Sequence, residues 1–123
     1  MMRFGDADDW VLLAVLHAGG GKAAGLEAIL SAGDWINHAI FNYGEVRGGL
    51  ARLLRAGLVR QTAAGWTPSP AAVRAIRVRG FKKQFDALSA LMSASVADPR
   101  APRLRGVTSK IFDASVQAYL KRG

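Results

Sequence analysis

The sequence predicts a mainly helical domain that carries one small β-hairpin. Three observations support this fold class. Apolar residues recur at helical spacing through most of the 123 residues. The segment 43–56 has the pattern of a capped, amphipathic helix that ends before a glycine. Two short segments follow it, 58–62 and 65–67, and they flank an Ala-Ala-Gly turn, which is typical of a hairpin.

Two helices are expected before this segment, over about 8–17 and about 24–40. The first begins with Asp8 and Asp9, whose carboxylates suit the unpaired N–H groups at a helix start. It is apolar on nearly every side, so we expect it at the centre of the core. The second has apolar residues near helical spacing, but Gly33-Asp34 predicts a bend or a break.

The helix over 43–56 has the clearest local signals. Asn42 is a good N-cap, and Glu45 stands three residues later, as in a capping box. Gly57 suits the position just after the last turn. One face is expected to be buried: Val46, Leu50, Leu53, Leu54 and Gly57. The opposite face is expected to be exposed: Arg47, Gly48, Ala51, Arg52 and Arg55.

The C-terminal half is expected to be helical on both sides of a loop. Ser69 and Pro70 suit the N-cap and first position of a helix that continues to about residue 96, with an interruption at Gly80. A narrow apolar stripe within it indicates packing on another helix, in the same chain or in a second subunit. A loop over 97–106 then precedes a last amphipathic helix over about 109–121. The stripe consists of Phe81, Phe85, Leu88, Met92 and Val96.

Composition excludes several classes of protein. Half of the residues are apolar, which favours a packed core over disorder. The absence of cysteine excludes disulfides, thiolate metal sites and thiol nucleophiles. Asp6, Asp8 and Asp9 stand where a signal peptide needs an apolar segment, and the longest apolar run, 10–16, is too short to span a bilayer. We therefore expect a cytoplasmic protein with no membrane partner.

The net charge of +8 is unevenly distributed. Residues 1–69 carry six basic and six acidic side chains, so this half is neutral. Residues 70–123 carry eleven basic and three acidic side chains, and they hold the whole excess. A basic half favours a polyanionic partner such as nucleic acid. The alternative is that the arginines only keep a small protein soluble.

The segment from Asp34 to Pro68 carries a resemblance to a known superfamily. Its helix runs from Gly44 through Leu50-Ala51-Arg52-Leu53-Leu54 into Ala56-Gly57-Leu58-Val59, and its hairpin ends at Thr67-Pro68. With the order of elements around it, the chain resembles the winged helix-turn-helix superfamily, and most of all small bacterial regulator domains of the MarR and PadR kind. The likeness covers residues 8–75. It implies a winged-helix domain over 1–79 and, by analogy, a C-terminal helical extension over 80–123 that forms a dimerisation region.

The resemblance implies a homodimeric DNA-binding protein that regulates transcription. The helix 43–56 would enter a major groove as the recognition helix, and the hairpin 59–67 would lie beside it as the wing. The basic stretch 74–83 would add non-specific attraction to phosphates. The residues expected to contact DNA are Asn42, Tyr43, Arg47, Arg52, Arg55 and Arg60.

Two alternatives remain open from the sequence. The neutral N-terminal half and the small residues Gly48-Gly49 favour a winged-helix module that binds protein instead of DNA. The basic charge concentrated in 70–123 favours an RNA-binding or ribosome-associated protein. Neither alternative requires catalysis.

No pattern in the sequence indicates an enzyme, a metal or a cofactor. Gly19-Gly20-Gly21-Lys22 lacks the first glycine and the Ser or Thr of a phosphate-binding loop. The two histidines have no ligand cluster near them, and no serine stands in a nucleophile motif. No residue points to an effector ligand. Trp10 and Trp35 are expected in the core, and Trp66 is expected to pack back onto it.

Overall fold

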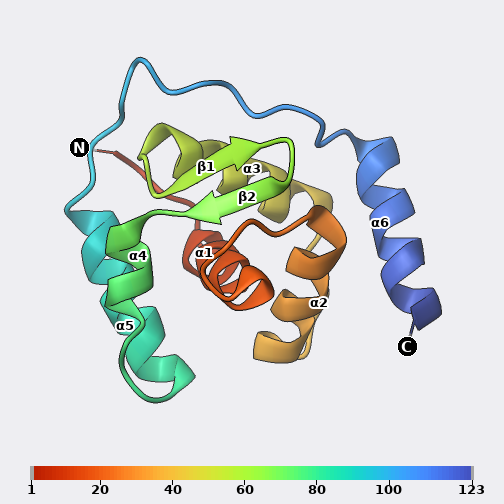
Figure 1. The fold of residues 1–123 in the computed structure, drawn as a ribbon, viewed down its shortest axis with the longest axis horizontal. Coiled ribbons are helices and arrows are strands. Elements are labelled where there is room, and N and C mark those ends of the chain that lie inside the picture. Colours follow the sequence, from red (N-terminus) through yellow and green to blue (C-terminus); the bar gives the residue numbers. More distant parts are fainter. Residues whose placement is uncertain (1, 123) are drawn as a thin grey trace.

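A computed structural model describes residues 2–122 and confirms a mainly helical protein with one two-stranded antiparallel hairpin (Figure 1). Within these residues, no helix combines the length and the apolar character needed to cross a membrane. The elements are α1 (Asp8–Gly19), α2 (Leu26–Asn37), α3 (Tyr43–Arg55), β1 (Val59–Thr62), β2 (Gly65–Pro68), α4 (Pro70–Ala75), α5 (Phe81–Ser93) and α6 (Ser109–Arg122).

The helix α1 lies at the centre of the core, as predicted. Residues 11–16 are all at most 2% exposed. The elements α2, α3, α5 and β2 each pack against α1 and together cover its sides (Figure 1). Because six successive residues lose contact with water, burial of α1 supplies much of the hydrophobic stabilisation.

The predicted break at Gly33-Asp34 is absent, and α2 continues through it to Asn37. Gly33 is buried because the ring of Phe41 packs where a side chain would be. The ring of Trp10 packs against that of Phe41, with centroids 3.9 Å apart, and its Nε1–H donates to the Gly33 carbonyl (2.9 Å). The glycine thus permits close packing and does not end the helix.

The capping signals of α3 are confirmed. The Glu45 N–H donates to the Asn42 side chain (2.7 Å), and the Asn42 N–H donates to the Glu45 carboxylate (2.9 Å). Gly57 follows the last turn with φ of +71°, where a residue with a side chain would be strained. The predicted apolar face is buried except for Gly57, which is exposed, and Gly49 joins it.

The hairpin is attached to the rest of the chain by an isolated β-bridge between Trp66 and Ala24. The pairs within it run from Val59 with Pro68 to Thr62 with Gly65. Trp66 and Ala24 exchange two backbone hydrogen bonds of 2.9 Å, which tie β2 to the segment before α2. The Trp66 side chain is buried, as predicted.

The predicted interruption before α5 is longer than expected, because α4 ends at Ala75 and residues 76–80 are not helical, with Gly80 at φ of +92°. Ser69 and Pro70 begin α4 as predicted, since the Ala72 N–H donates to the Ser69 side chain (3.1 Å). The apolar stripe of α5 packs on α1 within the chain. It ends at Met92, because Val96 is 70% exposed. Residues 80–122 therefore share one core with the preceding residues, through Leu88, Met92, Val107 and Phe112.

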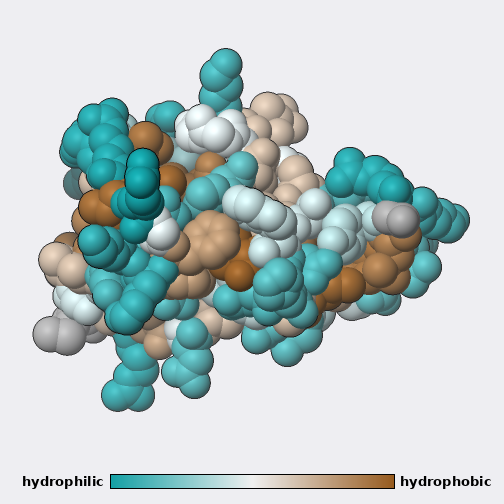
Figure 2. All heavy atoms as spheres, turned by 90° about the horizontal axis from the view of Figure 1, so that it is seen from below, coloured by the Kyte–Doolittle hydropathy of each residue, from teal (hydrophilic) through white to brown (hydrophobic). Residues whose placement is uncertain are grey.

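The core position predicted for Trp35 is wrong, because its side chain is 62% exposed at the last turn of α2. Trp10 is half-buried and packs against the core. Figure 2 shows the molecule from below the view of Figure 1, where apolar surface lies exposed between hydrophilic groups. The helical spacing of apolar residues in α2 did not show that the Trp35 side chain, in the last turn, points away from the core.

Replacing Gly33 with alanine is expected to lower the free energy of unfolding by about 1–2 kcal/mol. The new methyl group would overlap several atoms of the buried ring of Phe41, which places the cost in the upper part of the range of about 1–3 kcal/mol for overpacking. The better helix propensity of alanine offsets about 1 kcal/mol of that cost. Urea denaturation measures the change.

The matched control is Gly44→Ala, in the first turn of α3. Its added methyl group would meet only the Asn42 side-chain oxygen, at an ordinary 3.5 Å. We expect this variant to be as stable as the wild type or slightly more so. A Gly33→Ala variant as stable as the wild type, or more stable, would contradict the close packing of Phe41 on Gly33.

Candidate nucleic-acid interface

Residues 94–108, which we call the strap, connect α5 with α6 and cross α3 and the hairpin (Figure 1). The strap is fixed at its start by the Asp98 N–H, which donates to the Arg55 carbonyl at the end of α3 (2.7 Å). Further along, the Gln61 side chain of β1 and the backbone of Arg105 exchange two hydrogen bonds of 2.6 and 3.0 Å. These contacts hold the strap across the hairpin and the end of α3.

The end of the strap and α6 are fixed to the start of α3 and to α2. The Tyr43 hydroxyl donates to the Val107 carbonyl (3.1 Å), and Val107 itself is buried. Phe112 packs beside the Tyr43 ring, with centroids 5.7 Å apart. The Tyr119 hydroxyl donates to Asp34 on α2, and this hydrogen bond raises the pKa of Tyr119 above its ordinary value. The strap is thus anchored at both ends.

Two adjoining hollows flank the strap. The first, of about 450 Å³, lies between α3 and the strap, and the second, of about 340 Å³, lies between β1 and the strap. They share Asp98, Ala101, Pro102 and Arg103. We call the basic residues that line the two hollows the arginine surface: Arg47, Arg55, Arg60, Arg100, Arg103 and Arg105.

The arginine surface carries a strong excess of positive charge. All six side chains are exposed, and none forms an ion pair with a carboxylate of residues 2–122. Asp98 is the one acidic residue from the described chain that lines the hollows, and its carboxylate accepts the Arg100 N–H (2.9 Å). Guanidinium groups bind phosphate oxygens through two parallel hydrogen bonds. The surface is therefore suited to a phosphate-bearing ligand.

The structure divides the six predicted DNA-contact residues into two groups. Arg47, Arg55 and Arg60 are exposed and come together on the arginine surface. The side chains of the other three already have partners within the chain. Asn42 caps α3, Tyr43 anchors the strap, and Arg52 forms an ion pair with Asp8.

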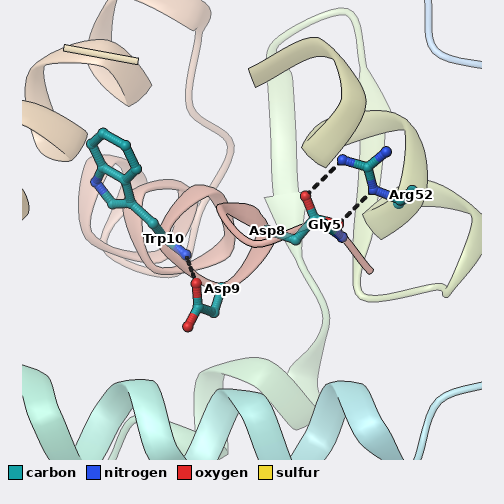
Figure 3. A network of polar contacts seen from close by, with 5 residues as sticks. All are labelled: Gly5, Asp8, Asp9, Trp10 and Arg52. Atoms are coloured by element: carbon teal, nitrogen blue, oxygen red, sulfur yellow. Dashed lines mark hydrogen bonds and ion pairs between the residues drawn. The ribbon is translucent and has the colours of Figure 1, made fainter. Parts of the chain in front are cut away.

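Arg52 reaches from α3 to the first turn of α1 (Figure 3). Its Nε–H and Nη2–H donate to the two oxygens of Asp8, at 2.6 and 3.0 Å. The Gly5 N–H also donates to the Asp8 carboxylate (2.8 Å), which is fully buried. The hydrogen bond to Asp8 raises the pKa of Arg52 above its already high value. The Arg52 side chain therefore joins two helices and is left out of the arginine surface.

The adjacent glycines Gly48 and Gly49 leave space for this ion pair and for the contact between α1 and α3. A methyl group on Gly49 would lie 2.8 Å from Val11, and one on Gly48 would lie 2.9 Å from the guanidinium of Arg52. The two small residues thus serve packing within the chain. Because the space beside both glycines is filled by this chain's own Arg52 and Val11, the glycine pair does not support the alternative of a protein-binding surface at this place.

Sequence reasoning missed Arg100, Arg103 and Arg105. The charge excess of 70–123 was the available signal, but nothing local indicated that this loop returns to α3. The other basic stretch, 74–83, includes the turn between α4 and α5, at the bottom of Figure 1, whereas the strap crosses the top. The two basic regions are therefore separate surfaces.

Comparisons with protein-family models, with curated proteins and with solved structures gave no match for this chain. The arginine surface offers guanidinium groups at the edges of two hollows and no buried acid–base pair or nucleophile. Its chemistry is that of anion binding.

Replacing Arg52 with alanine is expected to lower the free energy of unfolding by about 3 kcal/mol. Removing one partner of a buried ion pair costs about 3–5 kcal/mol, because the other charge stays buried and unpaired. The low end applies because the Arg52 side chain is itself 37% exposed, so solvent already screens the pair. Thermal and urea denaturation measure the change.

Arg47→Ala provides the control for the loss of an arginine from α3. Arg47 is exposed and has no ion-pair partner in residues 2–122. Its replacement should change the stability by no more than about 0.5 kcal/mol. An equal loss of unfolding free energy in the two variants would show that the ion pair between Arg52 and Asp8 does not stabilise the fold.

Proposed function

We propose that this chain is a DNA-binding protein whose arginine surface contacts the phosphate backbone. The observation that carries the proposal is the gathering of six exposed arginines, without ion-pair partners in the described chain, around two adjoining hollows. Phosphate contacts supply most of the affinity of non-specific DNA binding. The net charge of +8 adds long-range attraction to the same ligand.

The order of elements supports a winged-helix assignment for this domain. Three helices, a hairpin and a further helix follow one another in the order that the resemblance to MarR- and PadR-type regulators implies. Within that type, we propose a role in transcription regulation. Because a fold alone does not determine function, the arginine surface remains the stronger support for DNA binding.

The strap changes the expected mode of contact. Arg47, Ala51 and Arg55 lie on one face of α3, and the strap forms the opposite wall of the hollow above that face. A duplex would meet the strap and the arginines together, before α3 could enter a major groove. We therefore propose contacts to phosphates instead of deep insertion of α3. Affinity should then depend steeply on salt and only weakly on sequence.

Fluorescence anisotropy with random-sequence duplex DNA tests this proposal. The triple variant Arg47→Ala/Arg55→Ala/Arg103→Ala removes the arginines of the first hollow. A plot of the logarithm of the binding constant against the logarithm of the salt concentration has a negative slope, and each lost phosphate contact makes it shallower by about 0.9. We therefore expect weaker binding at every salt concentration and a slope that is shallower by about 2 to 3.

The matched control removes the same charge from the other basic region, as Arg74→Ala/Arg77→Ala/Arg79→Ala. All three of these arginines are exposed. This variant should lose only long-range attraction, with a nearly unchanged slope. Equal effects of the two variants, or a larger effect of the control, would overturn the assignment of the interface. Stronger binding of the wild type to structured RNA than to duplex DNA would overturn DNA as the ligand.

A further inference from the structure

The second hollow, between β1 and the strap, differs from the first in what lies at its base. Its lining includes Leu54 of α3 and Val59 of β1, two buried apolar side chains. Ala101 and Pro102 add apolar surface from the strap. The lining of the first hollow contains only exposed and half-buried residues. The second hollow therefore reaches down to the core, whereas the first does not.

Exposed charged groups lie at the edge of the second hollow. Four arginine side chains line it, and none of them is paired with a carboxylate of residues 2–122. Asp98 is the acidic residue of the described chain in the same lining, so positive charge predominates. An apolar base with guanidinium groups at its edge is complementary to a molecule that has an apolar body and an anionic head. The four arginines are Arg60, Arg100, Arg103 and Arg105.

The two walls of the second hollow are held together within the chain. The Gln61 side chain of β1 and the backbone of Arg105 exchange two hydrogen bonds, and the Asp98 N–H donates to the Arg55 carbonyl. These contacts fix the strap beside β1. The volume of the hollow, about 340 Å³, lies at the lower end of the range of about 300–1,000 Å³ that is usual for small-molecule sites, which are largely pre-formed. Its size suits a small molecule with a compact apolar body.

We propose that the second hollow binds a small organic anion. The apolar body of this ligand lies on Leu54 and Val59, and its anionic head is bound by the arginines at the edge. A phosphate group alone would leave the apolar base uncovered, and a neutral apolar molecule would leave the arginines without a partner. Burial of apolar area and charge-assisted hydrogen bonds therefore favour the same ligand.

A bound organic anion would also affect the DNA contact, and this consequence rests on the proposed function. Arg60 and Arg103 belong to the arginine surface, and Arg103 lines both hollows. An anion bound at these side chains reduces the positive charge that a duplex meets. Because coupling between two ligands is reciprocal, each should weaken the binding of the other.

Equilibrium dialysis of the full chain with 2-naphthoate, without DNA, tests the site. This probe combines an apolar ring system with a carboxylate. Two further probes separate the two requirements, since 2-naphthol has the rings without a charge at neutral pH and inorganic phosphate has the charge without rings. We expect saturable binding of one 2-naphthoate per chain, and binding of each of the other probes that is at least about tenfold weaker.

A pair of double variants locates the site. Arg60→Ala/Arg105→Ala removes two arginines that line the second hollow only, and it should weaken 2-naphthoate binding by at least about tenfold. The strap stays attached in this variant, because Gln61 bonds to the backbone at Arg105. The matched control, Arg47→Ala/Arg55→Ala, removes the same charge from the first hollow and should bind 2-naphthoate within about twofold of the wild type. Circular dichroism checks that both variants keep the helical fold.

Three results would overturn the proposal. The first is no binding of 2-naphthoate up to millimolar concentration. The second is binding of 2-naphthol or of inorganic phosphate that is as tight as that of 2-naphthoate. The third is an equal loss of affinity in the two double variants. A wild type that binds 2-naphthoate but no duplex DNA would uphold this site and contradict the proposed function, and binding of DNA without 2-naphthoate would do the reverse.

Discussion

The burial of α1 on all its sides is the constraint on which the rest of the structure depends. Residues 11–16 leave no side of the helix for water, so α2, α3, α5 and β2 must all pack on it. The first turn of α1 also buries a carboxylate, because Asp8 is fully buried. A buried carboxylate is stable only with partners, and Arg52 and the Gly5 N–H supply them.

This ion pair also determines which side of α3 faces outward. With Gly49 packed against α1 and Arg52 bound to Asp8, the side of α3 that carries Arg47 and Arg55 is directed toward the strap. The strap brings three more arginines to the same place and covers α3 at its end. The orientation of α3 thus supplies a partner to the buried Asp8 and exposes the basic surface at the same time.

Local signals predicted most of the elements, because they act within a few residues. The Asn42–Glu45 capping box, the glycine after α3 and the Ser69-Pro70 helix start are each confirmed. Contacts between residues far apart in the sequence could not be predicted from the spacing of apolar and polar residues along the chain. Arg52 has the pattern of an exposed side chain until Asp8, 44 positions earlier, is placed beside it. The return of the strap to Arg55 and Gln61 and the exposure of Trp35 are likewise set by tertiary packing.

The most direct test of the arginine surface is an NMR titration of the arginine Nε–Hε signals with a short duplex DNA. If the guanidinium groups of the arginine surface bind phosphates, we expect the signals of Arg55, Arg60, Arg103 and their neighbours on that surface to shift together. Arg52 should stay unchanged, because Asp8 already holds its Nε–H. Shifts confined to Arg74, Arg77 and Arg79, or no shifts at all, would contradict phosphate binding at the arginine surface.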